Sequence, residues 1–248
     1  MDLRRRDLIR IRSVGLLLGT LLLVGCPGLD CLAGPPPEEA TQEQRRRVLV
    51  DELRREISDE RVLQALLRVP RHRFVPKSEL GEAYVNTPLP IGLSQTISQP
   101  FIVAFMTAAL KIEKGQRILE VGTGSGYQAA ILAELGAEVF SIEILPDLSE
   151  RAGKVLAALG YSKVHLRVGD GFDGWPEQAP FDGILVTAAP LAVPAPLVAQ
   201  LKEGGRLSIP IGPDGDQVLY TYVKREGRLV QLDRLPVRFV PMTGKALR

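Results

Sequence analysis

The chain has 248 residues, 45% of them hydrophobic, which is enough for one ordinary α/β domain with an appendage, or two very small domains, and excludes a disordered protein. The formal net charge is +2, and five arginines and two aspartates within residues 1–12 account for that surplus. The rest of the chain lacks the basic excess that neutralises a phosphate backbone, so nucleic acid is not an expected partner.

The N-terminal segment predicts an export signal. Arginines precede an apolar run at residues 13–25, which is too short to cross about 30 Å of hydrocarbon as a helix. The run ends in LVGC at residues 23–26, which resembles a bacterial lipobox with Cys26 as the acylated residue, and the arginines upstream resemble a twin-arginine signal. We therefore expect residues 1–26 to be a signal peptide and the mature protein to be a lipoprotein at the periplasmic face of a bacterial membrane. An uncleaved anchor or a gene start placed too far upstream would explain the same pattern.

A tether and two helices are expected next. Residues 27–40 are rich in proline and glycine, which is typical of a stiff polar linker. From Thr41 to Leu67 apolar residues recur at helical spacing, with Ser58-Asp59 available as a break and cap, so this stretch predicts two amphipathic helices. Residues 41–248 would then form one domain with an N-terminal helical extension.

The cysteines and histidines do not indicate a metal site. Cys26 and Cys31 are too close in sequence to cross-link a core and too few for a four-ligand zinc site. His72 lies between two arginines, where a surface cluster of cations is expected, and His165 lies within a predicted strand, where it is expected to pack. No metal is therefore expected.

Short β-rich runs alternate with helical stretches in the remaining sequence. An apolar helix is expected over residues 100–110, beginning at a proline. Strands are expected at residues 117–121, 138–142, 164–168, 181–186 and 206–210, and helices at residues 127–135, 146–159 and 194–201. This alternation predicts an α/β fold with a mostly parallel central sheet covered on both faces, and residues 217–223 and 229–235 predict an antiparallel hairpin at one edge.

A glycine-rich turn joins the first of these strands to the helix after it. Residues 122–126 read GTGSG, and Gly122, Gly124 and Gly126 let the backbone turn sharply and approach a ligand closely. Glu143 ends the next strand, about 20 residues further on, where an acidic side chain reaches the hydroxyls of a ribose. A tight turn and a solvated strand end are the alternatives to this nucleoside-binding interpretation.

The spacing and charge of this loop favour a methyl donor over a dinucleotide. The loop reads G-x-G-x-G, not the G-x-G-x-x-G that admits a pyrophosphate, and Glu120 just before it would repel that anion and attract a cation. S-adenosylmethionine, which carries a sulfonium and an ammonium group, meets that demand. At the end of the third strand, Asp170 is placed to accept a hydrogen bond from the adenine amino group, and Gly171 to admit the ring, although a plain turn would explain both.

Several motifs together resemble those of the protein-L-isoaspartate O-methyltransferases, over residues 69–243. The most specific is TISQP at residues 96–100, preceded by PIG at residues 90–92, and VPMT at residues 240–243 also matches. The sequence departs at Val103 from some relatives of eukaryotic type, which have a histidine near the cofactor. The family methylates the misplaced carboxyl of isoaspartyl residues in damaged proteins, which starts repair through a succinimide.

The resemblance implies a Rossmann-like methyltransferase fold with S-adenosylmethionine at the carboxyl ends of the strands. It also implies that Ser98 is the catalytic serine, whose hydroxyl holds one oxygen of the substrate carboxylate while the other faces the methyl group. Ser98 is also well placed to cap the following helix, and the two roles are compatible. The resemblance also implies that Thr96 and Ile97 line the cofactor pocket. It implies further that the peptide is bound at Ala188, Ala189 and Thr243. Small residues at positions 188 and 189 would also allow close packing.

Two other functions fit parts of the sequence. One is a methyltransferase that uses the same cofactor on a small molecule, and the other is an exported lipoprotein that keeps the fold as a non-catalytic binding module. Members of the family act in the cytosol, where the methyl donor is made, so a cytoplasmic location is the alternative to export. Isoaspartyl proteins and peptides are the expected partners of a monomer, which would contact the membrane only through its lipid anchor.

Overall fold

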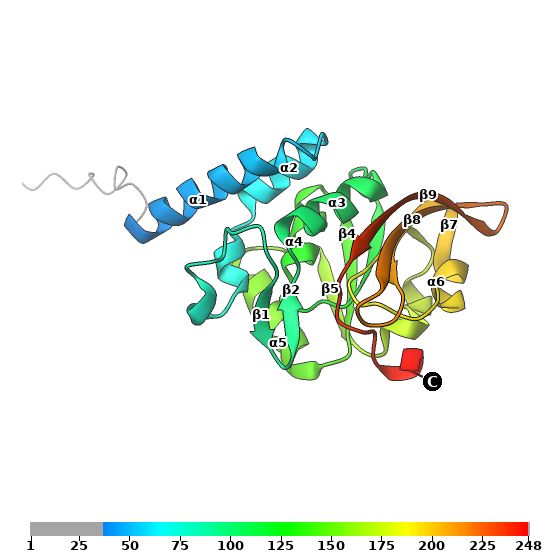
Figure 1. Ribbon diagram of the computed structural model, residues 1–248. Coiled ribbons are helices and arrows are strands. Elements are labelled where there is room, and N and C mark those ends of the chain that lie inside the picture. The colour runs from blue at the N-terminus through cyan, green and yellow to red at the C-terminus, as the bar shows by residue number, and fades with distance from the viewer. Residues whose placement is uncertain (1–36, 248) are drawn as a thin grey trace, which may run out of the picture. The chain divides into compact units, whose positions relative to one another are not determined.

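The computed structural model describes residues 37–247 (Figure 1), so the predicted signal peptide and its lipidation site at Cys26 lie outside the described residues. Within residues 37–247, a seven-stranded sheet lies at the centre of the fold, in the order β5-β4-β3-β6-β7-β8-β9. The first five strands of that order run parallel, and β8 and β9 are antiparallel. The strands are β3 (Arg117–Val121), β4 (Glu138–Glu143), β5 (Val164–Val168), β6 (Phe181–Val186), β7 (Leu201–Ile211), β8 (Gln217–Arg225) and β9 (Arg228–Val237). The predicted parallel sheet with a hairpin at one edge is confirmed.

Helices cover both faces of this sheet. One face packs against α3, α4 and α5, and the other against α6. These helices are α3 (Pro100–Leu110), α4 (Tyr127–Glu134), α5 (Pro146–Ala158) and α6 (Ala195–Gln200). Each begins and ends within one residue of its predicted boundary. Short 3₁₀ turns lie at Arg71–Phe74, Lys77–Glu79, Gly171–Asp173, Pro176–Gln178 and Gly244–Leu247.

The two predicted N-terminal helices are α1 (Pro37–Leu53) and α2 (Glu60–Arg68). As expected, Asp59 caps α2, since its side chain accepts a hydrogen bond from the backbone N–H of Arg61 at 3.0 Å. The predicted tether at residues 27–40 is too long, because α1 already begins at Pro37. Proline suits the first turn of a helix, and the acidic residues that follow it favour the positive end of the helix dipole.

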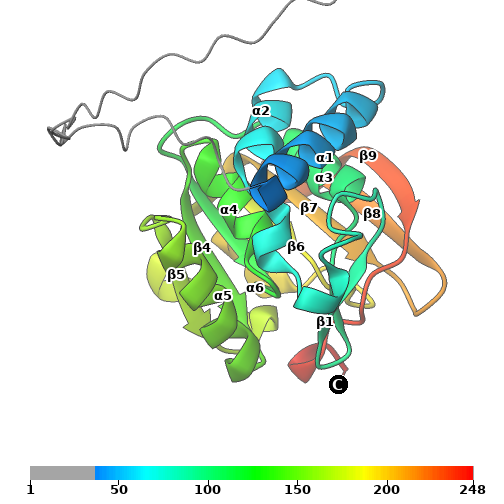
Figure 2. The ribbon, with the colours of Figure 1, turned by 90° about the vertical axis from the view of Figure 1, so that its left-hand side faces the viewer.

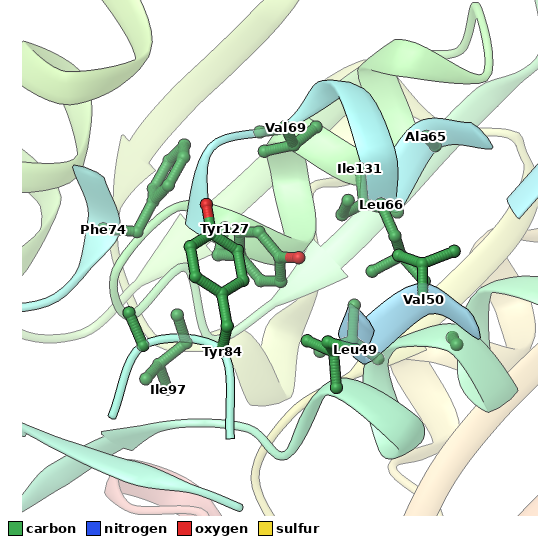
Figure 3. Packing of buried hydrophobic residues seen from close by; sticks show 14 of the residues in the cluster. Leu49, Val50, Ala65, Leu66, Val69, Phe74, Tyr84, Ile97, Tyr127 and Ile131 are labelled. Atoms are coloured by element: carbon green, nitrogen blue, oxygen red, sulfur yellow. The ribbon is translucent and has the colours of Figure 1, made fainter. Parts of the chain in front are cut away.

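Helices α1 and α2 belong to the core of the domain. Leu49 and Val50 of α1, Ala65 and Leu66 of α2, and Ile131 of α4 form part of one cluster, in which each of these five is at most 3% exposed (Figure 3). Burial of a large aliphatic side chain contributes about 1.5 to 3 kcal/mol to folding. The helical extension is therefore an integral layer outside α3 and α4, as Figure 2 shows.

A separate hairpin lies before α3 in the sequence. Strands β1 (Leu89–Gly92) and β2 (Gln95–Ile97) pair antiparallel, and the turn between them has φ of 53° at Leu93 and 57° at Ser94. The Arg151 guanidinium of α5 donates a hydrogen bond to the Ile91 carbonyl at 3.2 Å, which holds the hairpin against α5. The TISQP motif therefore leaves β2 and enters α3 at a fixed position.

No helix within residues 37–247 is both long enough and apolar enough to cross a membrane.

Candidate active site

The glycine loop after β3 has a backbone conformation and a close contact that only glycine permits. Gly122 has φ of 95°, and a Cβ there would lie 2.2 Å from Thr187 Oγ1. The same Thr187 hydroxyl donates to the Gly122 carbonyl at 2.7 Å, and the Gly122 N–H donates to the Ile142 carbonyl at 2.8 Å. The loop is thus fixed between the ends of β4 and β6. Thr187 was missed in the sequence, where the only signal was its position directly before Ala188 at the end of a strand.

Glu143 lies at the end of β4, as expected, but it is not a solvated strand end. Its side chain is buried, and one carboxylate oxygen accepts the Gly124 N–H at 2.8 Å while the other accepts the Leu145 N–H at 3.1 Å. These two bonds orient the carboxylate beside the glycine loop. Each oxygen keeps a lone pair that can accept a hydrogen bond from a hydroxyl of a bound ligand.

Ser98 does not cap α3. The residue before the first turn of α3 is Gln99, which makes no capping bond through its side chain. The capping acceptor comes from a distant residue instead, because Asn86 Oδ1 accepts the Phe101 N–H at 3.0 Å. The Ser98 hydroxyl has no hydrogen-bond partner among residues 37–247, so it is free to bind a ligand. Asn86 could not be recognised in the sequence, since no local pattern links it to α3.

Asp170 and Gly171 lie beyond the end of β5. Asp170 Oδ1 accepts the Phe172 N–H at 3.0 Å, and Oδ2 accepts the Lys245 N–H at 2.8 Å, which ties the C-terminal segment to this turn. A Cβ at Gly171 would lie 2.3 Å from Val121 Cγ1, so close approach to β3 requires glycine there. The turn is therefore a junction between β3, β5 and the chain end.

A single cavity of about 670 Å³ brings most of the predicted residues together. That volume is within the range of about 300 to 1,000 Å³ that is usual for cofactor and small-molecule sites. The predicted residues that line it are Thr96, Ile97, Ser98, Gly122, Gly124, Glu143, Asp170, Gly171, Ala188 and Thr243. The oriented Glu143 carboxylate fits a nucleoside cofactor, and so does the glycine loop, which has no room for a Cβ beside Thr187 at Gly122.

Three predicted site residues do not line this cavity. Glu120, which was expected to face the cofactor, differs most from its prediction. Its side chain is fully buried, and its carboxylate bonds to Ser141 Oγ, which in turn bonds to Thr123 Oγ1 at 2.6 Å. Successive side chains of a strand alternate between faces, so Val121 reaches the cavity and Glu120 does not. Burial raises the pKa of Glu120 to about 8, so at neutral pH it is largely a neutral acid and not the anion expected to attract a cation.

Gly126 and Ala189 are the other two. Gly126 is the residue directly before α4 and has φ of 86°, and a Cβ there would press on Ala152 and Leu156 of α5, so glycine serves helix packing at this position. Ala189 uses its backbone to hold the C-terminal segment, since its N–H donates to the Val240 carbonyl at 2.9 Å and its carbonyl accepts the Met242 N–H at 2.8 Å. Ala189 therefore supports the cavity wall without lining it.

The two histidines lie outside the cavity. His72 is buried, with Nδ1 2.8 Å from the Tyr84 hydroxyl and Nε2 3.2 Å from a carboxylate oxygen of Glu39, so the expected surface cluster is wrong at this residue. Helix α1 covers it, which no local pattern indicates. His165 stacks on Phe140 with ring centroids 4.9 Å apart, in agreement with the predicted packing role. Within residues 37–247 no group of histidines, cysteines and carboxylates has the arrangement of a metal site.

Comparison with known proteins gives one consistent family. Residues 44–247 match the family model described as protein-L-isoaspartate(D-aspartate) O-methyltransferase. A protein-L-isoaspartate O-methyltransferase of Opitutus terrae is 52% identical over 92% of this chain and 96% of its own length. Protein-L-isoaspartate O-methyltransferase 2 of Syntrophobacter fumaroxidans is 48% identical over 94% of this chain and 98% of its own length.

Solved structures agree with the sequence relatives. A protein-L-isoaspartate O-methyltransferase superposes with a TM-score of 0.76 at 32% identity, over 81% of this chain and 67% of that chain. A putative protein-L-isoaspartate O-methyltransferase from Plasmodium falciparum, solved in complex with S-adenosyl-L-homocysteine, superposes with a TM-score of 0.70 at 28% identity, over 80% of this chain and 98% of that chain.

Proposed function

Because the chain belongs to the protein-L-isoaspartate(D-aspartate) O-methyltransferase family, we propose that it transfers a methyl group from S-adenosylmethionine to the free carboxyl of L-isoaspartyl residues in damaged proteins. The observation that carries this proposal is the unpartnered Ser98 hydroxyl, which lines the same cavity as the glycine loop and Glu143. Family membership favours this function over a small-molecule methyltransferase and over a non-catalytic binding module.

The cofactor site uses the residues that the cavity brings together. Glu143 accepts hydrogen bonds from the ribose hydroxyls, and the backbone of Gly122 and Gly124 approaches the cofactor closely. Asp170 accepts a hydrogen bond from the adenine amino group with the lone pairs that Phe172 and Lys245 leave free. When bound, S-adenosylmethionine supplies an activated methyl group on its sulfonium.

Ser98 orients the substrate. Its hydroxyl donates a hydrogen bond to one oxygen of the isoaspartyl carboxylate and leaves the other oxygen to face the methyl group. No histidine or lysine lines the cavity within residues 37–247, and none is needed as a base, because a carboxylate is already a nucleophile. Positioning and partial removal of water therefore supply most of the rate.

The test is a methyl-transfer assay with an isoaspartyl peptide and the matching normal aspartyl peptide. We expect methanol release only from the isoaspartyl peptide. A hydrogen bond to a charged group contributes about 1.5 to 3 kcal/mol, so Ser98→Ala should lower kcat/KM by about 10- to 100-fold. Its affinity for S-adenosylhomocysteine should change little. Activity of Ser98→Ala within about threefold of the wild type would remove Ser98 from the mechanism.

We also propose that the chain is exported and lipidated at Cys26, since a basic segment, a short apolar run and LVGC follow one another at residues 1–26. Fractionation of cells that make the protein and mass measurement of its N-terminus test this. A diacylated N-terminal Cys26 in the membrane fraction is expected, and a soluble protein that retains Met1 would contradict export.

We propose that the protein is a monomer, which light scattering tests. A mass near twice that of one chain would contradict this proposal.

A further inference from the structure

Arg238 is the one cation among the described residues that line the cavity. The other charged residues of the lining are the carboxylates of Glu143 and Asp170. Both carboxylates belong to the cofactor site under the proposed function. Because the substrate of that function is itself a carboxylate, the two acidic residues repel it, and Arg238 supplies the opposite charge.

The Arg238 side chain is free although its backbone is held firmly. The next residue, Phe239, donates its N–H to Gln217 Oε1 at 2.6 Å, and its carbonyl accepts a hydrogen bond from Gln217 Nε2 at 3.1 Å. Gln217 is buried, so this pair anchors the segment that follows β9. The Arg238 side chain is exposed and makes no hydrogen bond or ion pair with any residue of 37–247. A guanidinium on a fixed backbone with no internal partner is available to a ligand.

The reacting carboxylate is not the best partner for this guanidinium. A guanidinium binds a carboxylate through both oxygens at once, whereas methyl transfer needs one oxygen unshielded and facing the methyl group. Ser98, with a single hydroxyl, meets that requirement. Arg238, which is exposed at the cavity, is better suited to a carboxylate outside the reacting centre.

We propose that Arg238 is a specificity-determining residue that binds a second carboxylate of the substrate, on a residue next to the isoaspartyl residue. The enzyme then favours isoaspartyl sites with an acidic neighbour over sites with a basic neighbour. This inference rests on the proposed function, because it concerns the substrate of that reaction. An exposed ion pair limits the preference to about fivefold in KM, and salt reduces it.

The test uses three isoaspartyl peptides that differ only in the neighbouring residue, which is glutamate, glutamine or lysine. For the wild type we expect the lowest KM with glutamate and the highest with lysine, at equal kcat. Arg238→Gln should raise KM for the glutamate peptide by about two- to fivefold at low salt and leave kcat unchanged. Arg234→Gln is the matched control, since Arg234 is an exposed arginine of β9 that does not line the cavity.

The outcomes separate this inference from the proposed function. Methylation of all three peptides by the wild type with one common KM would overturn the role of Arg238 and leave the proposed function standing. An equal effect of Arg238→Gln and Arg234→Gln, or a fall in kcat in place of a rise in KM, would also overturn it. Failure of the wild type to methylate any isoaspartyl peptide would refute both.

Discussion

Glu120 provides a sharp test of the buried network beneath the cofactor loop. The carboxyl is completely buried, one of its oxygens bonds to Ser141, and the other, Oε1, has no partner within residues 37–247. Burial is the main cause that raises the pKa of Glu120 to about 8, and the negative charge of Glu143 adds to the rise. The substitution Glu120→Gln removes the ionisable group and nearly preserves its shape.

The pH dependence follows from the direction of that shift. Below about pH 4.5 the carboxyl is protonated in both the folded and the unfolded chain, so it contributes no difference in stability. As the pH rises towards about 8, the unfolded chain ionises at this residue and the folded chain does not, which costs about 1.4 kcal/mol of folding stability per pH unit. At pH 7 the loss amounts to roughly 3 kcal/mol, and above about pH 8 it levels off.

Urea unfolding of the wild type and Glu120→Gln without cofactor, between about pH 5 and about pH 8, measures this effect. We expect the variant to gain stability over the wild type as the pH rises, by several kcal/mol across the range. Glu226→Gln, in the exposed turn between β8 and β9, is the control and should show no such trend. A difference between wild type and Glu120→Gln that does not change with pH would refute the assignment of Glu120 as a buried neutral acid.

Three further substitutions test single contacts. Gly122→Ala places a Cβ against Thr187 at a positive φ, so we expect calorimetry to show at least a tenfold loss of affinity for S-adenosylhomocysteine, and unchanged affinity would contradict the tight loop. Asn86→Ala removes the cap at Phe101 and should lower unfolding stability by about 1 kcal/mol, whereas equal urea midpoints would exclude the cap. Glu143→Gln should weaken S-adenosylhomocysteine binding by about tenfold or more in the same calorimetric titration, and full affinity would argue against the ribose contact.

The positions of most strands and helices were predictable because hydrophobic runs and helical spacing are local signals. Strands β3, β5 and β6 have the predicted bounds. Strands β4, β8 and β9 extend one or two residues beyond their predicted ends, and the largest departure is β7, which begins at Leu201 and not at residue 206. Its first residues include Lys202 and two glycines, which read as a turn, but Leu201 pairs with Phe181 of β6 and a register shift accommodates the extra residues. That pairing depends on a neighbouring strand, so the local sequence does not carry it.

The candidate site was predictable where a motif includes the residue that lines the cavity. Gly122 and Glu143 are of this kind, because strand ends of a parallel sheet meet at one edge. A motif does not show whether Ala189 and Glu120 line the cavity. The role of Ala189 depends on where the C-terminal segment returns, and that of Glu120 on which face of β3 its side chain occupies. No sequence pattern indicated Arg238, because its proposed role in substrate binding depends on the charges of residues far away in the sequence.

The most direct test of the whole account is a crystal structure of the protein with S-adenosylhomocysteine and an isoaspartyl peptide bound. We predict that both ribose hydroxyls lie within hydrogen-bonding distance of Glu143, and that the Ser98 hydroxyl contacts the isoaspartyl carboxylate on the side that faces the cofactor sulfur. A cofactor bound outside this cavity, or a peptide carboxylate remote from Ser98, would contradict the account.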